Sequence, residues 1–148
     1  MTSADVDVVS VLAGMARELV APERGGALMV AREAGPVRPA AWLGDTAGSR
    51  RGAWVGTIDD TVIGFGFGRV EELADGRPLG VIDELFVEPG ARGIGVGEAL
   101  LEALVEWFDA EGCIGVDALA LPGDRATKNF FEGSGFTARL LVMHRRPG

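Results

Sequence analysis

The chain has 148 residues, a formal net charge of −8 and one cysteine. This length can bury a hydrophobic core, so we expect a single domain over residues 1–148. The negative charge argues against nucleic-acid binding, which needs cationic side chains to displace counterions from the phosphates. A single cysteine excludes an intramolecular disulfide and a cysteine-based metal site; no metal is predicted, and Cys113 is expected to be a small buried residue.

The N-terminus and the hydropathy of the chain bear on its location. No apolar run approaches the roughly 20 residues that a membrane-spanning helix needs. The first seven residues lack the basic start and the apolar stretch of a signal peptide. We therefore expect a cytoplasmic protein that does not bind a membrane.

The N-terminal part of the chain favours helices. Apolar residues recur at helical spacing over residues 6–20, and Pro22 ends that pattern. Residues 26–34 predict a second short helix. Residues 35–52 are rich in Gly, Pro, Ser and Arg and predict a loop. Trp42 lies in this loop, where we expect it on the acceptor side of a site.

A β-hairpin is predicted next. Residues 53–58 and 61–70 are strand-like, and Asp59-Asp60 forms the turn between them. Three glycines, Gly64 to Gly68, alternate with large apolar residues in the second strand, so one of its faces has almost no side chains. Either a neighbour packs very close to that face, or the glycines mark a bend or bulge.

A strand, a helix and a second strand follow. Residues 80–87 predict a buried strand with two carboxylates, Asp83 and Glu84, in its middle. Residues 95–111 predict an amphipathic helix, and residues 114–121 another apolar strand. This order indicates a right-handed parallel crossover, and with the hairpin it predicts an α/β (α+β) fold.

The C-terminal part predicts a helix and a last strand. The helix covers residues 125–132, with Asp124 before it, and the strand covers residues 136–144. His144 lies on this strand, and we expect it to have a surface or packing role. The apolar residues 140–143 suggest that the strand pairs across two chains, so a homodimer is expected.

The clearest signal for ligand binding is the loop Arg92-Gly93-Ile94-Gly95-Val96-Gly97. Alternate glycines at the start of a helix expose backbone N–H groups, which suit a pyrophosphate, and Arg92 adds a cation. The dinucleotide fingerprint Gly-x-Gly-x-x-Gly fails at its third glycine whether it is counted from Gly93 or from Gly95, and no Gly-Lys-Ser/Thr follows. The loop instead has the spacing Arg-x-x-Gly-x-Gly.

With this loop, the chain resembles the GCN5-related N-acetyltransferase (GNAT) family over about residues 53–136. The resemblance also rests on the strand of residues 82–87 and on the ending Phe130-Phe131-Glu132-x-x-Gly135-Phe136. It implies a mixed, mostly antiparallel central sheet with a parallel splayed strand pair, flanked by helices. It also implies acetyl-CoA as co-substrate and the amine of a small molecule or peptide as acceptor.

The resemblance further implies where the cofactor lies. In the family it occupies the gap between the splayed strands, which are here residues 80–87 and 114–121. A bulge in the first strand would open this gap and aim an N–H group at the thioester oxygen. The residues implied to bind the cofactor are Leu85, Phe86, Val87, Arg92, Gly93, Ile94, Gly95, Val96, Gly97, Glu98, Asp124 and Phe131.

A general base must take a proton from the amine, and two acids are candidates. Glu84 is favoured as base or amine-binding group, with Asp83 second. Neighbouring strand residues point to opposite faces, so only one of them can face the cleft unless a bulge intervenes. The alternative is that one or both acids merely pair with an arginine.

Two positions depart from the family pattern. Phe131 stands where many members have a tyrosine that protonates the departing thiolate. Asp124 stands where an asparagine often contacts the coenzyme, and it either keeps that contact or only caps the helix. Phe131 therefore motivates a second reading, a regulatory module that binds acyl-CoA without transferring the acyl group.

Overall fold

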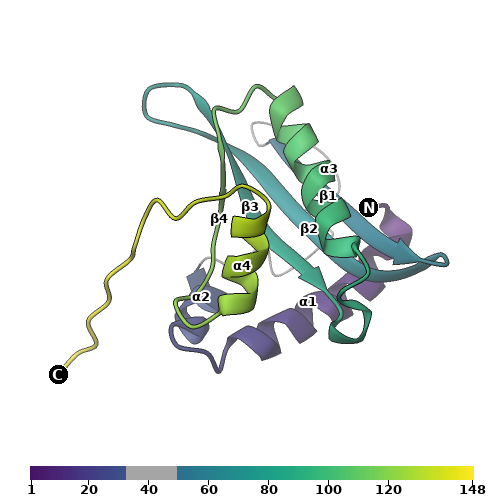
Figure 1. Cartoon of the computed structure of the whole chain (residues 1–148), viewed down its shortest axis with the longest axis horizontal. Helices are drawn as coiled ribbons and strands as arrows, with labels where there is room; N and C mark the ends of the chain where they lie inside the picture. Colours follow the sequence, from purple (N-terminus) through teal and green to yellow (C-terminus); the bar gives the residue numbers. More distant parts are fainter. Residues whose placement is uncertain (33–49) are drawn as a thin grey trace.

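The computed structural model describes residues 1–32 and 50–148 (Figure 1). Its helices and strands, in chain order, are η1 (Ser3–Asp5), α1 (Val6–Val20), α2 (Gly26–Arg32), β1 (Arg50–Ile58), β2 (Thr61–Glu72), β3 (Pro78–Val87), η3 (Pro89–Ala91), α3 (Val96–Ala110), β4 (Val116–Ala118) and α4 (Arg125–Gly133). None of the helices within these two ranges is both long and apolar enough to cross a membrane.

The described strands form one mixed sheet in the order β1-β2-β3-β4. The first three strands are antiparallel to one another, whereas β4 runs parallel to β3. Asp59 and Asp60 join β1 to β2, with φ angles of 48° and 64°. Two successive positive φ angles are what a tight hairpin turn requires, because they match the twist of the strands. The predicted hairpin and the predicted mixed sheet are thus confirmed.

Helices cover both faces of the sheet. On one face, α1 contributes Val9, Leu12 and Ala13 to a buried cluster with phenylalanines of β2 and β3. On the other face lies α3, whose buried residues Leu101, Leu104 and Phe108 pack with Ile82. Full burial of one such side chain contributes about 1.5–3 kcal/mol to folding. In both helices the apolar residues at helical spacing are the ones that face the sheet. The bounds of both helices agree with the prediction to within a residue.

The glycine-lined face of β2 is where α3 packs. A Cβ atom on Gly66 would lie 3.0 Å from Leu104 Cδ1, and one on Gly68 would lie 2.8 Å from Phe108 Cζ. These separations are shorter than ordinary carbon–carbon contacts, so the missing side chains leave the room that the helix occupies. Close packing is therefore the reason for these glycines.

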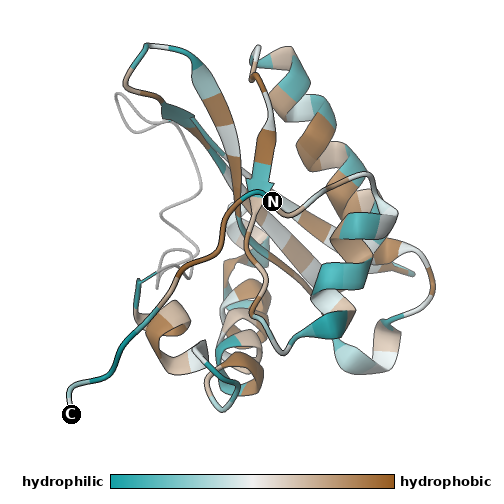
Figure 2. Cartoon of the chain, turned by 60° about the vertical axis from the view of Figure 1, so that its left-hand side comes forward, coloured by the Kyte–Doolittle hydropathy of each residue, from teal (hydrophilic) through white to brown (hydrophobic). Residues whose placement is uncertain are grey.

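The predicted strand over residues 136–144 is wrong. After α4 the chain forms no further strand in the described part, and it runs away from the sheet as an extended segment (Figures 1 and 2). Its residues from 137 onward, His144 included, are exposed. A strand needs a neighbouring strand to accept and donate its backbone hydrogen bonds, and this segment has none within the described chain.

Candidate active site

A bulge in β3 lies at the two acids that the sequence singled out. In the β2–β3 ladder Phe67 is opposite Glu84 and Gly68 is opposite Ile82, so Asp83 is an extra residue without a partner in β2. An extra residue bends the strand and re-aims the side chains on either side of it. The bulge that the resemblance implied is present in β3.

The bulge directs both carboxylates to the α1 side of the sheet. Glu84 lies opposite Phe67, which packs under α1, and its Oε1 is 3.7 Å from Nη2 of Arg17 on α1. Asp83 Oδ1 accepts a hydrogen bond of 3.2 Å from Nε of Arg69. Arg69 is two residues beyond Phe67 in β2 and therefore on the same face. Strict alternation would have separated the two acids.

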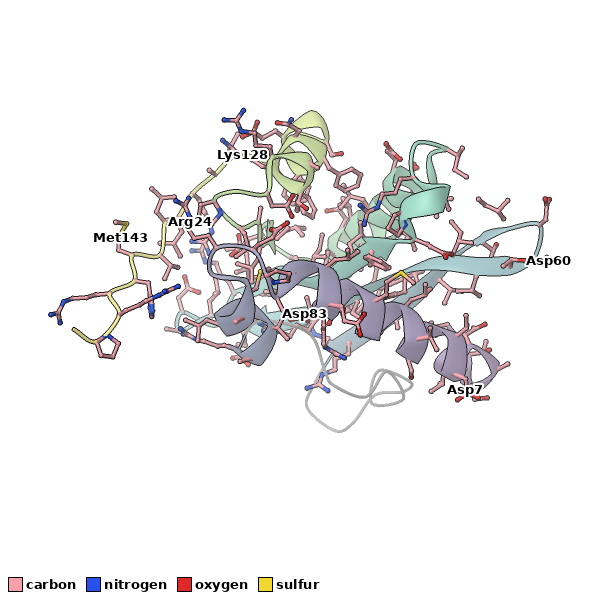
Figure 3. All side chains as sticks on the ribbon, turned by 90° about the horizontal axis from the view of Figure 1, so that it is seen from below. Asp7, Arg24, Asp60, Asp83, Lys128 and Met143 are labelled. Carbon is pink, nitrogen blue, oxygen red and sulfur yellow. The ribbon has the colours of Figure 1, made fainter. Side chains whose placement is uncertain are left out.

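Burial governs the acidity of Asp83. Its side chain is only 10% exposed and lies near the middle of the molecule (Figure 3). Burial raises the pKa of this carboxyl above its ordinary value, although the neighbouring Arg69 guanidinium opposes the rise. Among the described residues nothing donates a hydrogen bond to its second oxygen, Oδ2, which is buried. A buried acceptor of this kind is suited to take up a proton.

Beside the bulge, β3 and β4 part. Their parallel pairing covers only Gly80 to Ile82 on β3, opposite Val116 to Ala118 on β4. Beyond this point a cavity of about 580 Å³ opens between them, of the size that small-molecule ligands occupy. Its walls come from the C-terminal half of β3, the chain after β4, the starts of α3 and α4, and the α1–α2 region. The predicted splayed strand pair is therefore present, and β4 is shorter than predicted because it loses its partner.

The glycine loop leads from β3 into α3 along this cavity. Gly93 and Gly95 have φ angles of 90° and 86°, in the left-handed region that glycine adopts without strain. The first i to i−4 bond of α3 runs from Ala99 N to Gly95 O. The N–H groups of Val96 and Gly97 precede that bond, so they have no acceptor within the helix. Their position at a helix N-terminus favours an anion.

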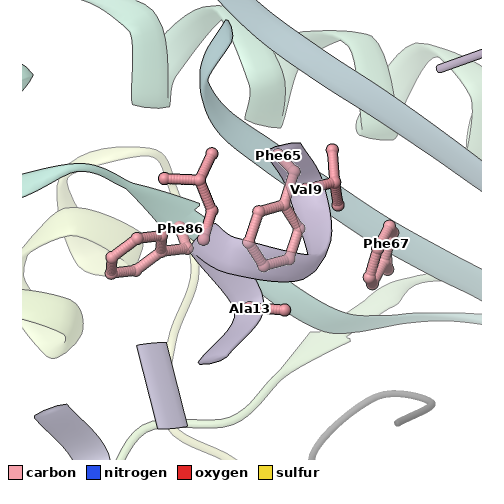
Figure 4. Close-up of a cluster of buried hydrophobic side chains, with 6 residues drawn as sticks. Val9, Ala13, Phe65, Phe67 and Phe86 are labelled. Carbon is pink, nitrogen blue, oxygen red and sulfur yellow. The ribbon is translucent and has the colours of Figure 1, made fainter. Parts of the chain in front are cut away.

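Arg92 links this loop to the end of β3. Its Nε donates a 2.9 Å hydrogen bond to the Val87 carbonyl oxygen, and its guanidinium carbon lies 5.5 Å from the centre of the Phe86 ring. Phe86 itself belongs to the cluster under α1, together with Phe65 and Phe67 (Figure 4). Arg92 thereby fixes the loop relative to the core while it contributes a positive charge to the cavity wall.

The cavity gathers most of the residues that the resemblance implied for the cofactor. Those in its wall are Leu85, Phe86, Val87, Arg92, Gly93, Val96, Gly97, Glu98, Asp124 and Phe131. Ile94 and Gly95 are not among them. They line a separate hollow of about 270 Å³ between α3 and β1 instead. The loop therefore lines two separate hollows, with Val96 in the wall of both.

Asp124 and Phe131 close the cavity on the α4 side. Asp124 caps α4, because its Oδ1 accepts from Thr127 N at 3.0 Å and its Oδ2 from Thr127 Oγ1 at 2.6 Å. The helix cap is thus present, and Asp124 also lies in the cavity wall. Phe131 packs edge-on to Phe130 and against Phe136, with ring centres about 5 Å apart. Its ring brings no acidic proton to the cavity.

Sequence reasoning missed the arginines of the site. Arg17 and Arg69 come from separate elements, and no motif surrounds either of them. The sequence held one clue to such partners, because two adjacent acids in a buried strand require cationic or hydrogen-bonding neighbours.

Three further residues and the question of a metal site remain. The ring centres of Trp107 on α3 and Trp54 on β1 are 5.4 Å apart, whereas Trp42 falls outside the described residues. Cys113 is only half buried, and burial raises the pKa of its thiol, which keeps it protonated. Within residues 1–32 and 50–148, no three His, Cys, Asp or Glu side chains cluster as a metal site.

The model of the acetyltransferase (GNAT) family matches residues 17–136. Glucosamine 6-phosphate N-acetyltransferase of Trypanosoma brucei brucei is 35% identical over 68 residues, which are 46% of this chain. The matched segment spans 44% of that protein's length, so less than half of the relative is represented.

Two solved structures illustrate the likeness of the fold. The tetramutant of the BH1408 protein from Bacillus halodurans superposes with a TM-score of 0.82 at 18% identity, over 99% of this chain and 97% of that one. The structure of AAC(6')-Iy in complex with the bisubstrate analogue CoA-S-monomethyl-acetylneamine gives a TM-score of 0.72 at 18% identity, over 100% and 95% of the two chains. At such identities the likeness concerns the fold alone.

Proposed function

The chain belongs to the acetyltransferase (GNAT) family, and we propose that it transfers an acetyl group from acetyl-CoA to a primary amine of a small molecule or peptide. The observation that carries the proposal is the bulge at Asp83. It sets two carboxylates beside the point where β3 and β4 part, at the edge of a cavity of the size that small-molecule ligands occupy.

The described residues fit coenzyme A as the co-substrate. The backbone of Leu85 and Phe86 faces the gap left by the parted β4 and is available to pair with the amide groups of a pantetheine arm. The first N–H groups of α3, with Arg92 beside them, match a diphosphate in charge and in hydrogen bonding. Gly93 keeps this approach open, because a Cβ atom there would meet nothing within 4 Å.

The reaction needs a neutral amine and a group to receive its proton. The amine nitrogen attacks the thioester carbon, a C–N bond forms, the C–S bond breaks, and the sulfur leaves as a thiolate. We assign the departing amine proton to the carboxylate pair. The raised pKa of Asp83 suits it to accept that proton, and Glu84, whose Oε1 lies 3.7 Å from Nη2 of Arg17, is placed to bind the amine. Water can relay the proton between amine and carboxylate.

A panel of amines tests this proposal through the release of CoA thiol. The panel includes glucosamine 6-phosphate, an aminoglycoside and a peptide with a free N-terminus, the first two because proteins similar to this chain are named for them. With the best acceptor, Glu84→Gln and Asp83→Asn are each expected to lower kcat by about 100-fold or more and to leave acetyl-CoA affinity within about twofold. Unchanged turnover in both variants would refute the assignment.

Phe131 favours one alternative, a module that binds acyl-CoA and does not transfer the acyl group. In the described part of the cavity wall, the ring of Phe131 offers no proton to a departing thiolate. This alternative predicts that calorimetry detects acetyl-CoA binding while no amine in a broad panel releases CoA above the rate of hydrolysis.

A further inference from the structure

The side of the cavity formed by α1 and α2 is apolar. Helix α2 lies beside the C-terminal end of α1 (Figure 1), and apart from Arg17 and Glu23 the described wall residues of this region are Ala16, Leu19, Val20, Met29 and Val30. The chain after β4 packs against the turn between the two helices, because a Cβ atom on Gly25 would lie 3.5 Å from Leu121 Cδ2. A lining of this kind favours an apolar ligand, whose burial removes hydrocarbon surface from water.

This apolar wall begins beside the two carboxylates of the bulge. Arg17, whose Nη2 lies 3.7 Å from Glu84 Oε1, is the neighbour of Ala16 in α1. Leu19 and Val20 follow Ala16 at spacings of three and four residues, so they continue its face of the helix. Four residues of helix advance roughly 6 Å along the axis. An amine whose nitrogen meets the carboxylates can therefore lay a short hydrocarbon chain along this face.

The charges on this side favour an amine and disfavour an anion. Two arginines near the site are already paired with buried acids, Arg17 with Glu84 and Arg69 with Asp83. Beyond the end of α1 the wall adds a third carboxylate, Glu23. On this side of the described structure, a phosphate or carboxylate of a ligand would have to compete with buried acids for these cations, which is costly. A primary amine, which is cationic near neutral pH, is complementary to the same surface.

We propose that the acceptor is a small primary amine with an apolar substituent and without an anionic group. The amine nitrogen binds at Asp83 and Glu84, and the substituent lies against Leu19, Val20 and Met29. Met29 suits such a wall because its flexible thioether adapts to substituents of different shape. The role of this amine as acceptor rests on the proposed function, whereas its binding can be measured without turnover.

Two matched probes test the proposal by calorimetry on the full chain in the presence of CoA. Hexylamine and 6-aminohexanoate have the same chain length and the same amine, and a carboxylate replaces the terminal methyl group of hexylamine in the second. We expect the dissociation constant of hexylamine to be at least about tenfold lower, because only the carboxylate must give up its water to an apolar wall. Equal or tighter binding of 6-aminohexanoate would overturn the proposal, as would the absence of hexylamine binding at about 10 mM.

A pair of leucines tests where the substituent lies. Leu19 lines the cavity, whereas Leu28 on α2 does not, and the two side chains are similarly exposed, at 48% and 46%. Leu19→Lys brings a cation to the apolar wall, so it should weaken hexylamine binding at least about tenfold and tighten the binding of 6-aminohexanoate. Leu28→Lys, the matched control, should leave both constants unchanged. Lysine is a good helix former, so both variants should keep the fold, which circular dichroism checks. The same constants in both variants would overturn the proposal.

Turnover separates the failure of this proposal from the failure of the proposed function. Hexylamine binding in a panel where no amine releases CoA from acetyl-CoA would refute the transfer and confirm the apolar amine site. Acetylation of glucosamine 6-phosphate with a kcat/KM above that of hexylamine would support the transfer and overturn the choice of acceptor.

Discussion

Asp83 and Arg69 meet at 3.2 Å where β3 carries one residue more than β2. The guanidinium stabilises the ionised carboxylate, whereas burial favours the protonated acid, and burial is the stronger influence. Arg69 also contacts Glu71, so its charge is shared between two acids. In the proposed role of Asp83 as a base, the balance of burial and this contact sets the pH range over which the carboxylate can accept a proton.

The pH dependence of turnover should therefore respond to Arg69. A base works only when ionised, so activity is lost as the pH falls through its pKa, and the raised pKa of Asp83 places this loss above the ordinary aspartate value of 3.8. Arg69→Gln removes the stabilising cation and should move the acid limb of the kcat profile to still higher pH. Arg77→Gln, at an exposed turn, is the control. An acid limb that stays in place in Arg69→Gln would separate Asp83 from catalysis.

Gly97→Asp should separate helix stability from cofactor binding. A carboxylate in the first turn of α3 interacts favourably with the helix dipole, so the free energy of unfolding should stay the same or rise by about 0.3–1 kcal/mol. The same charge repels a diphosphate, and calorimetry should show acetyl-CoA binding weakened by about 100-fold. Asparagine has the shape of aspartate without its charge, so Gly97→Asn should weaken acetyl-CoA binding much less. Equal losses of acetyl-CoA affinity in the two variants would mean that the side chain excludes the cofactor by its bulk and not by its charge.

Phe131→Tyr tests whether the chain lacks a general acid. The new hydroxyl would lie in the cavity wall and could protonate the thiolate as the C–S bond breaks. We expect kcat to rise by about 100-fold, the lower end of what general acid catalysis supplies. Phe136→Tyr, on a ring that packs against Phe131 but does not line the cavity, is the control. An unchanged kcat in Phe131→Tyr would mean that thiolate departure needs no acid from the protein.

Replacement of glycine by alanine should have opposite effects on the free energy of unfolding at two positions. In Gly68→Ala the new methyl group would lie 2.8 Å from Phe108 and 2.9 Å from Leu104, which forces α3 away from the sheet. Chemical denaturation should show a loss of about 1–3 kcal/mol. Gly14→Ala, in α1, meets nothing within 4 Å and should gain about 0.5–1 kcal/mol, because alanine is the better helix former. A stable Gly68→Ala variant would contradict the close packing of α3.

Much of the fold could be predicted from local patterns. The two long helices follow from apolar residues at helical spacing, and the hairpin from its alternation and its Asp59-Asp60 turn. The glycine loop was recognisable because its function constrains backbone conformation, which only a few residue types permit.

What the sequence could not provide depends on contacts between distant segments. Arg17 and Arg69 reach the two acids from α1 and β2, and nothing local distinguishes them from other arginines. The predicted last strand failed for a related reason. Residues 140–143 have the composition of a strand, yet a strand forms only where another strand is available to pair with it.

The edge-to-face contact of Trp54 and Trp107 joins β1, at one edge of the described sheet, to the helix whose N-terminus opens on the cavity. Two indoles at a ring separation of 5.4 Å couple their electronic transitions. The chain therefore carries a built-in optical reporter: an exciton couplet in its ultraviolet circular dichroism spectrum should vanish when α3 detaches from the sheet. Unfolding of this half of the protein can thus be followed without any label.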